Sequence, residues 1–144
     1  MVSEWDFMES LNGLSSLWTT IHCGTAPGGP CDEYNGIGSR TGMTRGEWHT
    51  IGFEIDRQEG NWRNQTMKWV LDGKEVFEVS GQKVNDTSAW RQLTVKEHYL
   101  IFNVAVGGSF PDALSQNGTT PTAMTVGGKA AGFEVDYVGV WNSI

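Results

Sequence analysis

Residues 4–9 read Glu-Trp-Asp-Phe-Met-Glu, so three carboxylates stand among bulky apolar side chains. On a helix, Glu4 and Glu9 point to different sides and cannot share a task. On a regular strand, side chains alternate, so Glu4 and Asp6 share one face while Glu9 falls on the other. The stretch therefore brings its acids together only if the strand departs from regular alternation.

A β-bulge at Phe7-Met8 would restore the parity, because two residues then occupy the space of one. All three acids then line one face, and Trp5 anchors the opposite face in a core. Grouped carboxylates disfavour one another's ionisation, which a structural strand does not need. A glycosidase does need a nucleophile, a protonated acid and a third carboxylate between them, and in retaining enzymes the carboxyl groups stand roughly 5–5.5 Å apart. The alternative is a solvated edge strand whose acids point into water.

This stretch resembles the catalytic strand of glycoside hydrolase family 16, whose laminarinase-like members carry the pattern Glu-x-Asp-x-x-Glu. The resemblance implies that Glu4 is the nucleophile, Asp6 the assisting carboxylate and Glu9 the acid/base. The six-residue spacing resembles the β-1,3-glucanase side of the family more than the five-residue lichenase side. Trp5 replaces the aliphatic residue that is more common there, and we expect this change to alter packing rather than chemistry.

Two further stretches carry the resemblance. Residues 22–31, His-Cys-Gly-Thr-Ala-Pro-Gly-Gly-Pro-Cys, resemble the segment after the catalytic strand in fungal members. They imply that His22 contacts or supports the substrate, although a lone His is more often a structural residue. Trp18 shares the face of His22 on an expected strand from Ser16 to Cys23, and we count it among the substrate-binding candidates.

The second stretch, residues 101–111, resembles the family's Asn-x-Ala-Val-Gly-Gly-x-Trp-Pro segment. It implies that Asn103 lies in the floor of the cleft and that Phe110 replaces a Trp that stacks on sugar. Other stretches with strand character are residues 48–55, 67–71, 76–79, 99–106 and 133–141. We expect loops at 24–46 and 111–128, and one helix within 86–97 capped by Thr87 or Ser88.

The length and the resemblance together predict a single all-β domain over residues 1–144, a concanavalin A-like β-jelly-roll sandwich. Nineteen glycines among many Thr and Val residues favour strands joined by turns. The resemblance covers only the second part of the family's domain, so we expect an incomplete sandwich without its N-terminal strands. Unpaired strands of such a sandwich would favour self-association.

The net charge of −7 disfavours nucleic acid and anionic membrane surfaces as partners. A neutral β-glucan polysaccharide is compatible with this charge. No segment is apolar enough to cross a membrane.

Several features predict an extracellular protein, although the first residues do not form a signal peptide. Cys23 and Cys31 are the only cysteines and can close a small loop as a disulfide. Asn64, Asn85 and Asn117 each begin a glycosylation sequon. The alternative is a pair of free thiols and three chance sequons.

No cofactor is expected, since the sequence has no His/Cys cluster and no phosphate-binding or dinucleotide motif. The resemblance raises one metal question, because many family members bind a structural calcium through the residue that matches Asp136. The partner ligands come from the missing start of the domain, so we do not expect a complete calcium site.

These observations predict an endo-acting, retaining hydrolase of β-1,3-glucan or mixed β-1,3/1,4-glucan. A transglycosylase would differ only in the acceptor that reaches the intermediate. The alternative from a different class is a non-catalytic carbohydrate-binding module or an inactive half-domain, which needs aromatic platforms but not the acidic triad.

Overall fold

The computed structural model describes residues 2–116 and 118–142. The chain divides into two compact units, Met1–Tyr99 and Leu100–Ile144, and each unit is described by itself. The first unit contains the acidic stretch and all the strands of the described residues. The single domain predicted over residues 1–144 remains a prediction.

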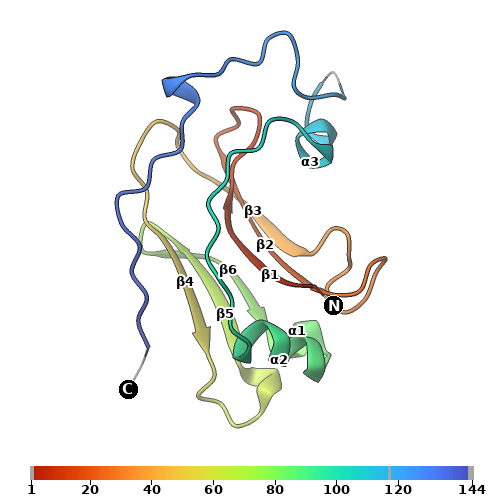
Figure 1. Cartoon of the computed structure of the whole chain (residues 1–144). Helices are drawn as coiled ribbons and strands as arrows, with labels where there is room; N and C mark the ends of the chain where they lie inside the picture. The colour runs from red at the N-terminus through yellow and green to blue at the C-terminus, as the bar shows by residue number, and fades with distance from the viewer. Residues whose placement is uncertain (1, 117, 143–144) are drawn as a thin grey trace. The chain divides into compact units, whose positions relative to one another are not determined.

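The first unit is built from two antiparallel sheets of three strands each, in the orders β1-β2-β3 and β4-β5-β6 (Figure 1). Hairpin turns at Asn12-Gly13 and Asp72-Gly73 join neighbouring strands, and all four residues have positive φ angles, as type I′ turns require. The predicted all-β, jelly-roll-like class is confirmed by this arrangement. The strands are β1 (Val2–Glu9), β2 (Ser16–Gly24), β3 (Ile37–Gly42), β4 (Ile51–Asp56), β5 (Thr66–Leu71) and β6 (Lys74–Ser80).

The described chain contains several short helical segments, one between β4 and β5 and the others after β6, where the sequence predicted only one helix. None in the described part of the chain has the length and apolar character needed to span a membrane. The helical segments are η1 (Trp62–Asn64), α1 (Gly81–Val84), α2 (Thr87–Val95), α3 (Ser109–Ala113) and η2 (Lys129–Ala131).

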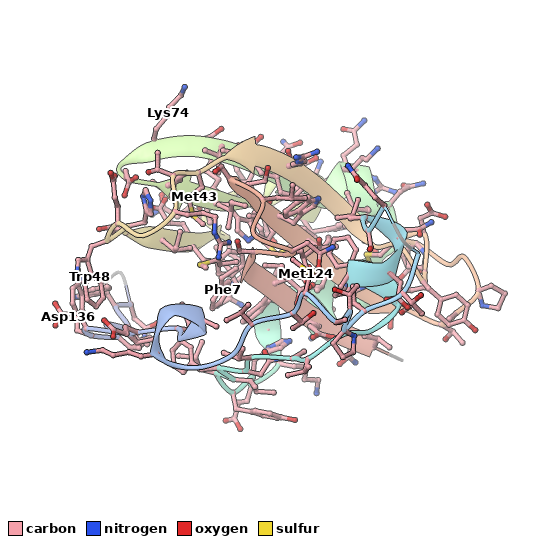
Figure 2. All side chains as sticks on the ribbon, turned by 90° about the horizontal axis from the view of Figure 1, so that it is seen from above. Phe7, Met43, Trp48, Lys74, Met124 and Asp136 are labelled. Carbon is pink, nitrogen blue, oxygen red and sulfur yellow. A yellow bond between two sulfur atoms is a disulfide. The ribbon has the colours of Figure 1, made fainter. Side chains whose placement is uncertain are left out.

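The core of the first unit lies between its two sheets. Ile21 of β2 packs in one cluster with Met67 and Trp69 of β5 and with Trp90 and Leu93 of α2. A second cluster contains Met43, and Figure 2 shows Met43 and Phe7 pointing into this unit while Lys74 extends away from it. Burying large apolar side chains between sheets contributes roughly 1.5–3 kcal/mol for each residue.

The loop predicted at residues 24–46 is partly wrong, because it contains strand β3. Residues of β3 alternate between half-buried and exposed, and the strand pairs with β2 along its whole length. A Cβ at Gly38 would lie 2.7 Å from the carbonyl oxygen of Thr19. The glycine therefore allows the close approach of β3 to β2, although its low strand propensity hides the strand in the sequence.

The strands predicted at residues 99–106 and 133–141 are also wrong, because neither segment is a strand in the described structure. A strand is defined by hydrogen bonds to a neighbouring strand. Neither segment pairs with another within the described chain, and apolar side chains such as Ile101 and Val140 are 65% and 85% exposed. The apolar pattern thus gives these segments the composition of strands, but they do not form strands in the described structure.

The predicted helix exists as α2, but its cap is neither Thr87 nor Ser88. Asp86 is the N-cap, and its carboxylate accepts a hydrogen bond of 2.8 Å from the backbone N–H of Ala89. A carboxylate in this position also interacts favourably with the positive end of the helix.

Replacing this cap tests the correction. Asp86→Ala should lower the free energy of unfolding by about 1 kcal/mol, because an N–H group loses its partner at the start of α2. Thr87→Ala leaves the cap intact and should change stability by less than about 0.5 kcal/mol. Urea denaturation followed by tryptophan fluorescence measures both, and equal losses in the two variants would contradict the capping role of Asp86.

Candidate functional site

The pairing of β1 with β2 brings the three predicted acids to one face. The register is regular up to Asp6 and shifts between Asp6 and Glu9, where β1 carries an irregularity of the bulge type. Phe7 and Met8 of β1 therefore face the single residue Thr19 of β2, and Glu9 returns to the face of the other acids. The paired positions are Glu4 with His22, Asp6 with Thr20 and Glu9 with Trp18.

The opposite face of β1 is held by aromatic packing and one hydrogen bond. Trp5 and Phe7 both contact Phe53 of β4, with ring centroids 5.1 and 4.9 Å apart. The indole Nε1 of Trp69, a residue only 1% exposed, donates a hydrogen bond of 3.1 Å to the carbonyl oxygen of Asp6. This carbonyl lies where the ladder is interrupted, so the second sheet supplies a donor at the irregularity.

The acids and His22 form one electrostatic cluster. His22 Nε2 lies 3.3 Å from Asp6 Oδ2. Burial, reinforced by the charge of Asp6, raises the pKa of Glu9 to about 7, while His22 opposes this shift. Burial and then Asp6 also raise the pKa of Glu4 above its ordinary value, again against the effect of His22. Glu9 therefore carries a proton over much of the weakly acidic range, as a general acid must.

Sequence reasoning missed one member of this cluster, Glu33. Its side chain is buried and lies 2.9 Å from His22 Nδ1. The sequence offered one indication of this residue, namely that a carboxylate follows the second cysteine of the small loop by two positions. The neighbouring Asp32 is exposed and has a positive φ angle, so only the folded loop distinguishes the two acids.

The other predicted substrate-binding residues fall in two places. Trp18 is half-buried on β2, opposite Glu9, and the guanidinium of Arg40 lies 4.8 Å from the centre of its ring. Asn103 and Phe110 belong to the second unit, where Asn103 is exposed and Phe110 lies in α3. Their predicted roles in the cleft therefore remain predictions.

The disulfide expected from the sequence is present between Cys23 and Cys31, and both residues are fully buried. Asn64 and Asn85 are exposed, as a glycosylation acceptor must be. Asn117, the third predicted acceptor, lies outside the described residues.

Among residues 2–116 and 118–142, no group of three His, Cys, Asp or Glu side chains is arranged to hold a metal ion. Asp136, for which the resemblance raised the question of calcium, is exposed in the second unit.

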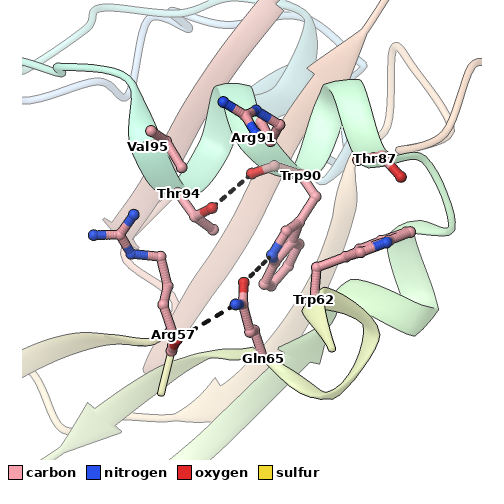
Figure 3. Close-up of a pocket in the computed structure, with 8 residues that line it drawn as sticks. All are labelled: Arg57, Trp62, Gln65, Thr87, Trp90, Arg91, Thr94 and Val95. Carbon is pink, nitrogen blue, oxygen red and sulfur yellow. Dashed lines mark hydrogen bonds between the residues drawn. The ribbon is translucent and has the colours of Figure 1, made fainter. Parts of the chain in front are cut away.

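A separate hollow of about 360 Å³ lies between α2 and η1, and none of the three acids lines it (Figure 3). Three hydrogen bonds join residues of its walls: Trp90 Nε1 donates to Gln65 Oε1 at 2.9 Å, Thr94 Oγ1 donates to the carbonyl of Trp90, and Gln65 Nε2 donates to the carbonyl of Arg57 at 3.4 Å. Arg57 and Arg91 also line it. The hollow thus belongs to the helical side of the first unit rather than to the acidic cluster.

Comparison with known proteins finds similar chains, whereas no protein-family model matches. A solved endo-1,3-β-glucanase from Streptomyces sioyaensis aligns over 87% of this chain with 36% identity and a TM-score of 0.77. The glucan endo-1,3-β-glucosidase A1 of Niallia circulans is 35% identical over 83 residues, or 56% of this chain. The clotting factor G α subunit of Tachypleus tridentatus is 31% identical over 110 residues, or 75% of this chain.

The lengths of these proteins differ greatly from that of the present chain. It spans 44% of the solved structure, and 11% and 14% of the Niallia and Tachypleus proteins. The likeness therefore concerns a part of each protein.

Loss of the Trp69 donor should disturb the acidic cluster. Trp69→Phe leaves the Asp6 carbonyl without its partner and should cost about 1–3 kcal/mol of stability from the hydrogen bond alone. It should also shift the His22 ring resonances in NMR spectra, because Asp6 contacts that ring. Trp90→Phe is the matched control, since Trp90 is equally buried but donates to Gln65. Similar shifts of His22 in both variants would contradict the positioning of Asp6 by Trp69.

The raised pKa of Glu9 predicts a specific dependence of stability on pH. The folded protein holds this proton more tightly than the unfolded chain, so the resulting stabilisation is complete below about pH 4.5 and is lost as the pH rises through about 7. Glu9→Gln is permanently neutral and escapes this loss. Its thermal midpoint should therefore rise relative to the unmodified protein between pH 4.5 and 7.5.

Glu54→Gln is the control for this measurement, because Glu54 is exposed on β4. Its difference from the unmodified protein should be constant over the same pH range. A constant difference for Glu9→Gln as well would show that the pKa of Glu9 is not raised.

Proposed function

We propose that this glycoside hydrolase family 16-like chain, which aligns with a solved endo-1,3-β-glucanase over 87% of its length, cleaves β-glucan internally with retention of configuration. The proposed substrates are β-1,3-glucan and mixed β-1,3/1,4-glucan. The observation that carries the proposal is the gathering of Glu4, Asp6 and Glu9 on one face of β1, with a protonated Glu9 at weakly acidic pH.

In the first step, Glu9 donates its carboxyl proton to the oxygen of the bond that breaks. Glu4 attacks the anomeric carbon, the carbon–oxygen bond to the leaving chain breaks, and a covalent glycosyl ester forms on Glu4. A raised pKa suits Glu9 to this task, because the proton must be present before it is transferred.

In the second step, Glu9 is ionised and takes a proton from water. The water oxygen attacks the anomeric carbon, the ester bond to Glu4 breaks, and the second inversion restores the original configuration. Asp6 lies between Glu4 and Glu9 in the sequence, and its negative charge raises the pKa of both. In this mechanism Asp6 favours the protonated form of Glu9 once Glu4 is ionised.

We further propose that the protein works outside the cell on a polysaccharide. The disulfide and the exposed sequons at Asn64 and Asn85 support an oxidising, glycosylating compartment. The exposed apolar side chains of the second unit, Ile101 and Val140 among them, support the proposal that the chain self-associates.

The nucleophile assignment is tested with Glu4→Gln. This variant should lower the release of reducing sugar from laminarin by at least roughly a thousandfold, because the amide cannot form the glycosyl ester. Its retention on insoluble β-1,3-glucan should be unchanged, since the shape of the site is conserved. Glu54→Gln, on an exposed position of β4, should retain full activity.

The same experiment separates the hydrolase from a non-catalytic carbohydrate-binding module. If the unmodified chain is retained on insoluble glucan but releases no reducing sugar, the binding module is the correct class. If Glu4→Gln hydrolyses laminarin at the normal rate, Glu4 has no part in the reaction.

A further inference from the structure

The small loop closed by the disulfide delivers a buried carboxylate to the acidic cluster. Glu33 is only 8% exposed. Its Oε1 accepts a hydrogen bond of 2.7 Å from the backbone N–H of Cys23, and its Oε2 lies 2.9 Å from His22 Nδ1. Each oxygen of this carboxylate therefore has a partner on β2.

The backbone of Glu33 is held as firmly as its side chain. Glu33 and Gly28 exchange backbone hydrogen bonds in an isolated antiparallel bridge. The Cys23–Cys31 disulfide ties the same loop to the end of β2, next to His22. The disulfide and the backbone hydrogen bonds with Gly28 together hold the backbone of Glu33, and thereby its carboxylate, in place.

His22 has a carboxylate at each ring nitrogen, with Glu33 at Nδ1 and Asp6 at Nε2. A ring in this setting donates from both nitrogens and is a cation. Hydrogen bonding to Asp6 is the largest influence on its pKa, and together with Glu33 it overcomes the opposing effect of burial and raises the pKa of His22 to about 9.

The charged groups around this imidazolium come from two elements. Asp6 of β1 and Glu33 of the loop raise the pKa of His22. In turn, His22 lowers the pKa of Glu4 and Glu9 of β1. On the side of β3, the neighbour is a glycine: a Cβ at Gly36 would lie 2.8 Å from His22 Cε1. The half-buried ring therefore lies against acids and close backbone, and its charge opposes the pKa increase of both Glu4 and Glu9.

We propose that Glu33 is a positioning residue for the hydrolysis: it holds the His22 ring against Asp6, in the middle of the acidic cluster. The inference rests on the proposed function for its consequence, whereas the contact itself is independent of activity. Glu33 has no direct part in bond breaking in this scheme. It acts through the His22 ring that it holds, and its own charge also raises the pKa of Glu4.

The test uses the full chain with Glu33→Gln, which retains the size of the side chain and removes its charge. Without the charge of Glu33, His22 should lose its proton at a lower pH and then hold Asp6 less firmly, so the basic limb of the kcat/KM profile for laminarin should move down by about one pH unit. On that limb, kcat/KM should therefore fall about tenfold at a fixed pH, with little loss at the optimum. Glu33→Asp retains the charge and should restore most of the profile.

A second readout does not depend on hydrolysis. The His22 ring should titrate at a lower pH in Glu33→Gln than in the unmodified chain, as followed by NMR, while Glu54→Gln should leave both the titration and the pH profile unchanged. If Glu33→Gln does not fold by circular dichroism, Glu33→Asp and the unmodified chain are compared instead, and a lower His22 titration with the shorter side chain is expected.

Several results would overturn the proposal. One is an unchanged His22 titration in the variants, and another is an equal loss of activity at every pH, which would indicate a structural role only. If the unmodified chain releases no sugar, the proposed function fails, and the titration still decides whether Glu33 maintains the charge of His22.

Discussion

The alternation of side chains along a strand is the constraint on which this structure depends. A regular β1 would separate Glu9 from Glu4 and Asp6, and the register shift between Asp6 and Glu9 removes this separation. The shift is supported from the other sheet, because Trp69 donates to the carbonyl of Asp6 where the ladder is interrupted. Core packing and site geometry are therefore coupled through a single backbone position.

Gathering acids on one surface has an electrostatic cost, and the structure offsets it locally. Asp6 raises the pKa of Glu4 and of Glu9, and His22 lowers both. The net effect is unequal, since only the pKa of Glu9 reaches about 7. Different degrees of burial on one face thus separate two chemically identical side chains in their pKa values, which the proposed acid catalysis by paired carboxylates requires.

The predictions that succeeded rest on local patterns. The alternation of side chains predicted an irregular strand at residues 4–9, and the pair of cysteines predicted the disulfide. The predictions that failed needed information from elsewhere in the chain. Residues 99–106 and 133–141 have the composition of strands but no neighbouring strand in the described structure. The sequence did not reveal β3, because Gly38 has a low strand propensity and serves the close approach of β3 to β2.

The sequence by itself determined the all-β class, the pair of cysteines that forms the disulfide, and the acids whose grouping requires an irregular strand. These features follow from side-chain period and residue type, which are properties of short segments. Only the tertiary structure decided that Glu33 rather than Asp32 faces His22, and that Trp69 holds the Asp6 carbonyl. Both contacts join residues from different elements, and a contact of that kind depends on how the loop closes and how the sheets pack, which no local pattern contains.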